Sequence, residues 1–404
     1  MPSLLASSLA SSLALAALAW SVPPPPRPGS MTLTAPPVSV RSLGGGDVGE
    51  THPLLVDTHA DTTQRITYQG ANFVNGIPGA HLDLPKMRAG GVDAQFFSIF
   101  VLPARTPPES YFTEALAQIE AVHGMVAASH GRLAVARTAG EVRENAARGI
   151  ASVLFGVEGG HALGNGSEAK QLAHLGRLAS EGVRYLTLTW TNSNAIGGSS
   201  GDDGDGRGLT DFGERLLDRM QTLGVMVDLS HVSDPLFWDA IRYVKKPVIL
   251  SHSSSRALAN VPRNVSDAML RAVARNGGAV CVNYNPAFLD AEYARKQAPL
   301  WAAMRTLPIE AGWRRVQEES ARLPPVPLGR LADHIMHMIE VAGVDHVCLG
   351  SDFDGIPATP AGLEDASKMP ALAAELLRRG VTPADLNKVW GLNTLRVLEA
   401  NEVQ

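Results

Sequence analysis

The sequence predicts an α/β protein, a (β/α)8 barrel of the TIM type with helical and loop segments inserted at the C-terminal mouth. From Leu54 onward, short apolar runs typical of strands alternate with longer amphipathic segments, which indicates repeated βα units around a parallel sheet. There are eight such runs. A doubly wound open sheet is the competing fold. It is disfavoured because the first run ends in His59-Ala60-Asp61 rather than in a glycine-rich phosphate-binding turn.

The runs and the segments between them define the expected elements in chain order. We expect strands at Leu54–Thr58, Asp93–Phe100, Ser152–Val157, Tyr185–Thr189, Val225–Leu229, Val248–Leu250, Ala279–Asn283 and Val347–Gly350. Helices are expected at Tyr111–Ser129, Glu168–Ala179, Thr210–Leu223, Asp234–Val244, Ser266–Asn276, Leu328–Val341 and Ala366–Arg379. The signals for helix ends are first-turn carboxylates at Asp211 and Asp267 and glycines after the helices at Gly182, Gly224, Gly277 and Gly343.

Two segments are longer than ordinary connections. Residues 192–208 contain the polar stretch GGSSGDDGDGRG, which we interpret as a surface loop because it lacks the spaced carboxylates and terminal Glu of a calcium loop. Residues 286–327 carry two tryptophans and mixed charge. This second segment could form a helical cap over one barrel mouth or a dimer surface, and a homodimer therefore stays open.

The composition indicates a folded globular protein. With 404 residues in the chain, 45% of them hydrophobic and 19% charged, residues 51–404 are expected to form a single barrel domain. The net charge of −5 provides no basic surplus, so nucleic acid is not an expected partner. Cys281 and Cys348 lie in apolar runs, and we interpret them as small core residues rather than as a disulfide.

Residues 1–50 differ from the rest and are expected to be a leader or signal segment with a proline-rich linker. Leu4 to Trp20 is an Ala/Leu/Ser run followed by Pro23 to Pro26, which resembles a secretory signal without its usual basic start. Alternatively, Met31 is the true start. The protein would be periplasmic or secreted in the first case and otherwise cytoplasmic. The run is too short and too rich in serine for a stable membrane span.

Polar side chains end five of the eight expected strands. In a barrel of this type the active site forms at the C-terminal ends of the strands, so these side chains should meet at one mouth. Any one of them alone would more readily be a capping or hydrogen-bonded loop residue, but six together predict a metal site. The six residues are His59, Asp61, Glu158, His231, His252 and Asp352.

Imidazole and carboxylate are the ligands that Zn²⁺ and similar divalent ions prefer in catalytic sites. Six groups are more than one ion needs, which predicts two metals about 3.5 to 4 Å apart. Glu158 is the natural bridge, since it ends the third strand, between the pair His59 and Asp61 and the pair His231 and His252. No lysine ends an expected strand, so a carbamylated lysine bridge is excluded.

Ten segments of the sequence resemble those of the membrane dipeptidase family, also called renal dipeptidase-like. The matching segments, in order, are VDTHAD, LDLPKMRAGGVDAQFFS, GVEGGHAL, GVRYLTLTW, GVMVDLSHVSD, PVILSHSSSRAL, RNVSD, GSDFDGIP, GLEDASK and ELLRRG. The resemblance implies a zinc-dependent dipeptidase on an amidohydrolase-type barrel, with two zinc ions per chain. It assigns one zinc to His59 and Asp61 and the other to His231 and His252, with Glu158 as the bridge.

The resemblance also implies roles for two further residues. Asp352 in GSDFDG matches the family's catalytic acid/base, and Arg263 matches the arginine that receives the C-terminal carboxylate of the substrate. The chemistry agrees. A metal-bridging hydroxide would attack the peptide carbonyl, Asp352 would pass its proton to the departing amine, and a bidentate contact from Arg263 would restrict the site to short peptides.

The sequence departs from the family pattern at Trp190. The family's dipeptidases usually carry a histidine there that contacts the substrate near the scissile carbonyl, whereas Trp cannot accept a proton and fills space. The resemblance nevertheless implies cleavage of small dipeptides, including those with a D-residue at the C-terminal position, which the family tolerates. One alternative is a related amide hydrolysis on the same site, either deacylation of N-acyl amino acids or β-lactam opening. The other alternative is a non-catalytic peptide-binding barrel.

Overall fold

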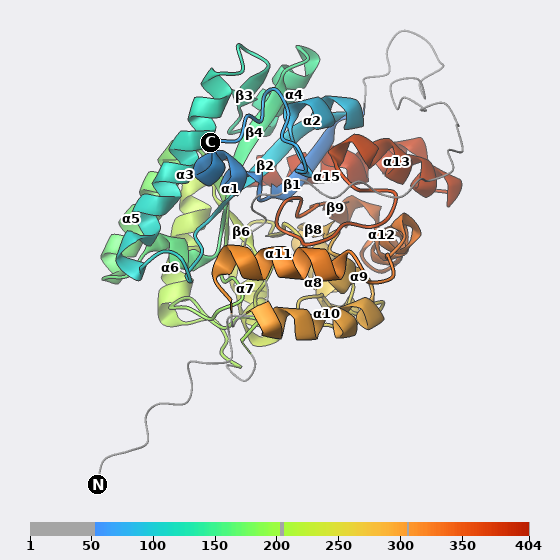
Figure 1. Ribbon diagram of the computed structural model, residues 1–404. Coiled ribbons are helices and arrows are strands. Elements are labelled where there is room, and N and C mark those ends of the chain that lie inside the picture. The colour runs from blue at the N-terminus through green and yellow to red at the C-terminus, as the bar shows by residue number, and fades with distance from the viewer. Residues whose placement is uncertain (1–52, 203–205, 305–306, 404) are drawn as a thin grey trace.

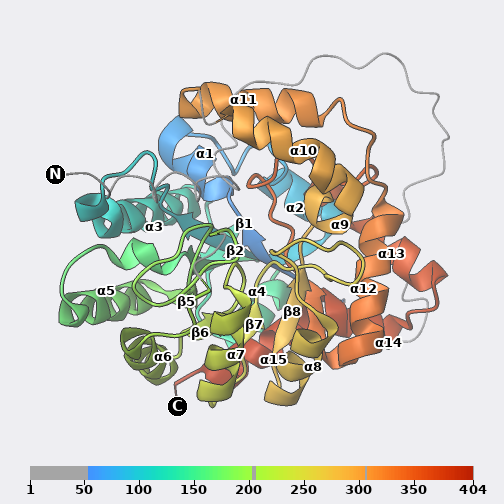
Figure 2. The same cartoon turned by 90° about the horizontal axis from the view of Figure 1, so that it is seen from below.

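The structure is a computed structural model that describes residues 53–202, 206–304 and 307–403. Its centre is a closed barrel of eight parallel strands in the order β2-β1-β9-β8-β7-β6-β5-β4, closed by the pairing of β2 with β4 (Figures 1 and 2). The strands are β1 Leu55–Ala60, β2 Val92–Phe100, β4 Ala151–Glu158, β5 Val183–Thr187, β6 Met226–Asp228, β7 Ile249–Leu250, β8 Ala279–Val282 and β9 Val347–Leu349. The predicted fold and its eight strands are confirmed. The sequence missed β3 (Leu133–Val135), which pairs only with β4 outside the barrel.

Helices surround the barrel, as Figure 2 shows. They are α1 Thr62–Gln69, α2 Leu84–Gly90, α3 Tyr111–Ala127, α4 Ala139–Ala147, α5 Glu168–Glu181, α6 Asp211–Leu223, α7 Asp234–Tyr243, α8 Asp267–Asn276, α9 Pro286–Leu289, α10 Ala291–Met304, α11 Ile309–Ser320, α12 Leu328–Ala342, α13 Met369–Arg378, α14 Pro383–Asn387 and α15 Asn393–Asn401. All seven expected helices are present. The last of them is divided into a 3-10 turn (Ala366–Lys368) and α13.

Helix α8 illustrates why these segments form where they do. The side chain of Ser266 accepts a hydrogen bond from the Met269 N–H at the start of the helix, and Gly277 ends it in the left-handed conformation with φ of 79°. Met269, Leu270 and Val273 are buried on one face. Gly343 differs from the other predicted helix-end glycines, because its ψ of 150° is extended rather than left-handed helical.

Strand β2 shows how the barrel divides the core into an interior and an exterior. Phe96 packs inside the barrel, with its ring centroid 5.4 Å from that of Tyr185. Phe97 points outward and packs against Phe73 at 5.3 Å. This alternation is the period-2 geometry of a strand, and both faces are buried because helices cover the outside.

The interpretation of the two cysteines as unpaired core residues is wrong. Cys281 on β8 and Cys348 on β9 are direct partners in the parallel register, and their sulfur atoms form a disulfide inside the barrel. They are fully buried, as expected. The sequence could not reveal the pairing because 67 residues separate the two cysteines, and they face each other only through the register in which β8 and β9 pair.

The two long insertions both lie near the ends of the strands. Residues 196–199 are buried, and Gly197 and Ser199 form antiparallel bridges to Leu209 and Val232, so this part of the predicted surface loop is instead packed. Helices α10 and α11 lie side by side (Figures 1 and 2), and their Trp301 and Trp313 join a buried cluster with residues that follow β2 and β5. Of the two alternatives for residues 286–327, this packing favours a helical cap that covers the mouth of the barrel rather than a dimer surface.

The predicted leader, residues 1–50, lies outside the described residues. Within the described part of the chain, no helix is both long enough and apolar enough to cross a membrane.

Candidate metal centre and active site

The structure brings the six predicted side chains to one end of the barrel, and all six are buried. His59 is the second-last residue of β1 and Glu158 is the final residue of β4, while the other four follow within three residues of the ends of their strands. The C-terminal ends of parallel strands meet at one face, which is why residues far apart in the chain converge here.

Glu158 occupies the middle of this group. Its Oε1 atom lies 3.0 Å from Nε2 of His231 and 3.5 Å from Nε2 of His252. Its Oε2 atom lies on the other side, 3.7 Å from Nε2 of His59. The two oxygens of one carboxylate therefore face two different sets of imidazole nitrogens, which is the arrangement a bridging carboxylate requires.

The second half of the group contains the two aspartates. Oδ2 of Asp61 is 3.6 Å from Nε2 of His59. Potential ligand atoms of His59, Asp61 and Asp352 all lie within 4.8 Å of one another, and the same holds for His59, Glu158 and His252. His59 thus belongs to both possible ligand triads.

Several buried polar atoms in this group have no hydrogen-bond partner among the described residues. They include Nε2 of His59, Oδ1 of Asp61 and Nδ1 of His231. Burying polar atoms without partners is costly, so a native site normally satisfies them with another group. A divalent cation facing the first two atoms would satisfy them, and the nitrogen and oxygen donor set suits zinc. The residues present therefore fit a metal.

The electrostatics of His231 and His252 suit metal ligation as well, whereas the pKa of His59 is raised well above its usual value, because Tyr185 and Glu158 outweigh the lowering effect of burial. Burial lowers the pKa of His231 to about 4 and lowers that of His252 well below its usual value, so both imidazoles are neutral at pH 7, as ligation requires. Burial alone would raise the pKa of Glu158. The charge of His59 and the hydrogen bonds from the histidines outweigh burial and hold this pKa well below its usual value.

Asp352 has the opposite perturbation. Burial, reinforced by Asp61 and Glu158 against the opposing charge of His59, raises the pKa of Asp352 to about 8. A bound cation would lower this value. The amide Nδ2 of Asn283 donates to Oδ2 of Asp352 at 2.8 Å and holds the carboxyl group in place. Asn283 was the last residue of the expected seventh strand, and its neutral side chain is why the sequence analysis missed it.

The backbone at the site is constrained. His231, Asp352 and Asp354 have φ values of 69°, 61° and 64°, a conformation that costs non-glycine residues about 1 to 3 kcal/mol. Gly355 allows the loop to approach the site, since a Cβ atom there would lie 2.0 Å from Oδ2 of Asp61. Asp354 forms a buried ion pair with Arg65 at 3.1 Å, which anchors the loop after β9.

Two buried aspartates hold the strand ends that carry site residues, and the sequence analysis did not identify them. Asp228 on β6 accepts hydrogen bonds from the backbone N–H and the hydroxyl of Ser251, the residue before His252. Asp57 on β1 binds Ser351, the residue before Asp352, in the same way. The available signal was an aspartate inside an otherwise buried strand, which needs a partner.

Arg263 is buried beside the histidines. It donates to Oγ of Ser253 at 2.9 Å and to the carbonyl of His252 at 2.7 Å, while its Nε has no hydrogen-bond partner in the described part of the chain. Among the described residues it forms no ion pair with a carboxylate. Burial lowers the pKa of Arg263 to about 10, so the guanidinium remains charged at neutral pH. A buried cation in this position is suited to receive an anionic group.

Trp190 is buried in the wall of the mouth. Its ring lies 4.8 Å from that of Phe100, in the cluster that also contains Trp301 and Trp313 of the cap. The contact of Trp190 with a substrate stays a prediction. His161 lies outside the ligand group, because its Nε2 pairs with the carbonyl of Val101 at 2.7 Å.

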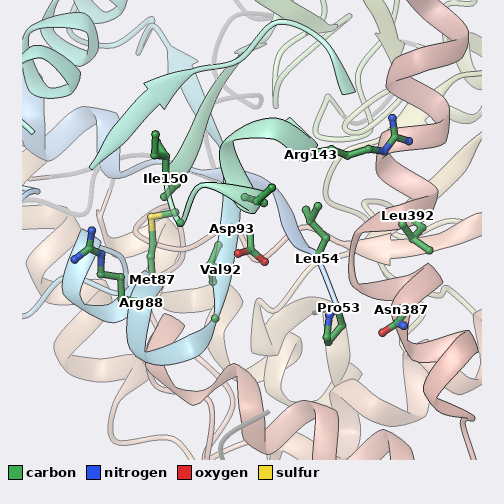
Figure 3. Close-up of a pocket in the computed structure, with 15 residues that line it drawn as sticks. Pro53, Leu54, Met87, Arg88, Val92, Asp93, Arg143, Ile150, Asn387 and Leu392 are labelled. Atoms are coloured by element: carbon green, nitrogen blue, oxygen red, sulfur yellow. The ribbon is translucent and has the colours of Figure 1, made fainter. Parts of the chain in front are cut away.

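A cavity of about 690 Å³ lies elsewhere, as Figure 3 shows. Its lining includes Leu54, Val92, Ile150 and Leu392, which lie at or before the starts of β1, β2 and β4 or near the C-terminus. This is the opposite end of the strands from the six clustered side chains, so the cavity is not the site of the chemistry.

Comparison with known proteins agrees with this geometry. The membrane dipeptidase family, peptidase family M19, matches residues 48–404. An uncharacterized dipeptidase of Schizosaccharomyces pombe is 35% identical over 377 residues, covering 87% of this chain and 81% of that protein. The dipeptidase verJ of Clonostachys rogersoniana is 34% identical over 333 residues, covering 80% and 76%.

Solved structures show the same relationship. A metallopeptidase from Rhodobacter sphaeroides, bound to a phosphinate mimic of the dipeptide L-Ala-D-Ala, superimposes with a TM-score of 0.71 at 29% identity, covering 86% of this chain and 99% of that one. The dipeptidase AC of family M19 gives a TM-score of 0.72 at 29% identity, covering 86% and 98%. This chain therefore belongs to the membrane dipeptidase family, peptidase family M19, and is a metallopeptidase on a (β/α)8 barrel.

Proposed function

We propose that this protein is a dipeptidase that works with two zinc ions and cleaves small dipeptides, including those with a D-residue at the C-terminal position. The observation that carries the proposal is the position of Glu158, whose two oxygens face separate sets of histidine nitrogens. One zinc would be held by His59 and Asp61, the other by His231 and His252, and Glu158 would bridge them.

Bound zinc supplies Lewis-acid activation of water and of the peptide carbonyl. The chain supplies the proton transfer. Asp352 lies within reach of the same centre, and its carboxyl group would take a proton from the attacking water and deliver it to the departing amine. Asn283 would keep Oδ2 of Asp352 oriented during both steps.

Arg263 would determine the orientation of the substrate by binding its C-terminal end. Its buried guanidinium, which pairs with no carboxylate among the described residues, can bind the C-terminal carboxylate of a dipeptide, and a longer peptide would place a neutral amide there instead. The phosphinate mimic of L-Ala-D-Ala in the Rhodobacter sphaeroides relative supports the extension to D-residues.

Trp190 bears on the alternative hydrolases. Its indole packs into the cap cluster and provides an apolar surface where the family usually has a histidine. N-acyl amino acids and intact β-lactams such as acylated penicillins also carry a carboxylate on the carbon next to the scissile amide nitrogen, but they have no free α-amino group on the acyl side. We propose that dipeptides are preferred, in agreement with the family.

A substrate panel tests this proposal. The purified, zinc-loaded protein would be given L-Ala-L-Ala, L-Ala-D-Ala, N-acetyl-L-alanine and a β-lactam, and kcat/KM compared. We expect both dipeptides to be the best substrates and metal analysis to find close to two zinc ions per chain. Faster turnover of N-acetyl-L-alanine would replace the dipeptidase with a deacylase, and a metal content near zero would overturn the zinc site.

A further inference from the structure

We infer that Tyr185 is a positioning residue that holds His59 in the tautomer needed for metal ligation. This inference rests on the proposed metal centre. Tyr185 lies on β5 and points into the barrel interior, where it is fully buried. Its hydroxyl lies 2.8 Å from Nδ1 of His59 and 3.0 Å from the carbonyl oxygen of Thr58.

The two contacts of this hydroxyl determine the direction of each hydrogen bond. The carbonyl of Thr58 can only accept, so the single proton of the Tyr185 hydroxyl is donated to it. The hydroxyl oxygen can then only accept from Nδ1 of His59, which must carry a proton. In the neutral imidazole, the lone pair is consequently on Nε2, the atom that faces Asp61 and Glu158.

Gly156 on β4 provides the space that this arrangement needs. It is the register partner of Tyr185, and a Cβ atom at position 156 would lie 1.9 Å from Cζ of the Tyr185 ring. Any larger residue would push the ring, and with it the hydroxyl, away from His59. The glycine and the tyrosine therefore act as a pair.

The other histidines have different partners, which separates the effect of Tyr185 from theirs. Nδ1 of His252 lies 2.7 Å from Oγ of Ser251, whose own proton is donated to Asp228 at 2.6 Å. Nδ1 of His231 has no partner among the described residues. Removal of the Tyr185 hydroxyl should therefore loosen His59 and leave the zinc ligands at His231 and His252 in place.

The test compares Tyr185→Phe with Tyr293→Phe. Tyr293 is a matched control, because it is buried like Tyr185 and its hydroxyl also donates to a backbone carbonyl, that of Ser320 in the cap. Zinc affinity would be measured by competition with a chelator, and the visible spectrum recorded on the cobalt-substituted proteins. We expect Tyr185→Phe to bind one of its two metals roughly 10- to 100-fold more weakly, with an altered cobalt spectrum. Tyr293→Phe should match the parent in both measurements.

A measurement on the unmodified protein covers the case in which Tyr185→Phe does not fold. Nitrogen-15 NMR of the zinc-loaded parent should find the proton of His59 on Nδ1, and a proton on Nε2 would overturn the inference. If the parent binds no zinc, the proposed function fails. If the parent binds two zinc ions and Tyr185→Phe binds them equally tightly with an unchanged cobalt spectrum, only the role of Tyr185 fails.

Discussion

Arg263 is a buried guanidinium whose hydrogen bonds go to a serine hydroxyl and a backbone carbonyl rather than to a carboxylate. Maintaining such a charge away from water is costly unless an anion completes the site. In a dipeptidase the substrate can supply that anion. The lysine ammonium has the same charge but cannot form the planar bidentate contact, which makes Arg263→Lys an informative change.

We expect Arg263→Lys to lower kcat/KM for L-Ala-L-Ala about 10- to 100-fold, chiefly through KM, because a charged hydrogen bond contributes roughly 1.5 to 3 kcal/mol. Steady-state kinetics would measure this loss. The corresponding dipeptide amide lacks the carboxylate and serves as the control substrate. The parent should cleave it poorly, and the variant should cleave it no worse. An equal loss for the acid and the amide would contradict carboxylate binding at this position.

Asp352 allows a second prediction for a single residue. Asp352→Asn keeps the shape of the side chain but removes the proton acceptor, so kcat should fall about 10²- to 10⁴-fold while the zinc content stays near that of the parent. Kinetics and metal analysis on the same preparation measure both. Asp333→Asn, which removes an ion pair with Arg379 outside the barrel, is the control and should retain activity. Full turnover by Asp352→Asn would exclude it as the acid/base.

At the scale of the elements, β8 and β9 are joined by a disulfide as well as by backbone pairing. Cys281 and Cys348 lie in the barrel interior, on the N-terminal side of the candidate metal centre. Strand β9 leads to Ser351 and Asp352. The cross-link therefore restrains the strand that delivers the proposed acid/base. It also closes a loop between residues 67 apart in the sequence.

We expect the double substitution Cys281→Ala and Cys348→Ala to lower the free energy of unfolding by up to about 4 kcal/mol, from the loop-closure entropy of a cross-link of this length. Urea unfolding of parent and variant would measure it, with the reduced parent as a control that keeps the sulfur atoms. A thiol assay on the denatured, unreduced parent should detect no free thiol. Two reactive thiols per chain would contradict the cross-link.

At the scale of the whole molecule, His334 ties three parts of the chain together. This residue of α12 accepts a hydrogen bond at Nδ1 from the backbone of Ser255 after β7, and its Nε2 donates to the carbonyl of Leu289 in α9. The bond at Nδ1 requires the neutral imidazole, because a protonated Nδ1 cannot accept, whereas Nε2 can donate in either protonation state. Burial lowers the pKa of His334 to about 4, so the folded protein resists protonation that the unfolded chain accepts near pH 6.5.

The stability that His334 contributes should therefore be fully present above pH 6.5 and be lost as the pH falls toward 4, because the unfolded state binds a proton that the folded state does not. The contribution of His334 is at most about 3 kcal/mol over this window. Urea unfolding at several pH values would show it. His334→Gln should weaken this dependence by about 1.4 kcal/mol per pH unit relative to the parent. Identical pH dependence in both proteins would contradict the role of His334.

Much of the fold could be predicted because its signals are local. A strand of a parallel sheet is buried on both faces and is therefore a nearly continuous hydrophobic run, such as residues 93–100. The longer helices have their own local signal, the amphipathic period. Strand β3 pairs with β4 outside the barrel and only the first of its three residues is buried, so its short run was not assigned as a strand of the barrel. The buried part of the loop, residues 196–199, was missed because its glycines pack against neighbouring segments that the local sequence does not specify.

The identity of the residues in the candidate site was also local information, since the six polar side chains stand at the ends of five strands that hydrophobic patterning predicts. Their supporting residues were not. Tyr185 and His59 are 126 positions apart, and Asn283 and Asp352 are 69 apart. Such pairs have no signature in either segment, because a hydrogen bond depends on distance and direction between atoms rather than on the spacing of residues in the chain.

The sequence by itself therefore determined the barrel, the family and the set of groups that could hold metal, because residue type and period are written along the chain. Only the tertiary structure decided how these groups face one another. It placed the oxygens of Glu158 toward two sets of nitrogens, left Arg263 without a carboxylate and joined Cys281 to Cys348. The physical reason is barrel closure, which sets the distances between strand ends that the chain itself leaves free.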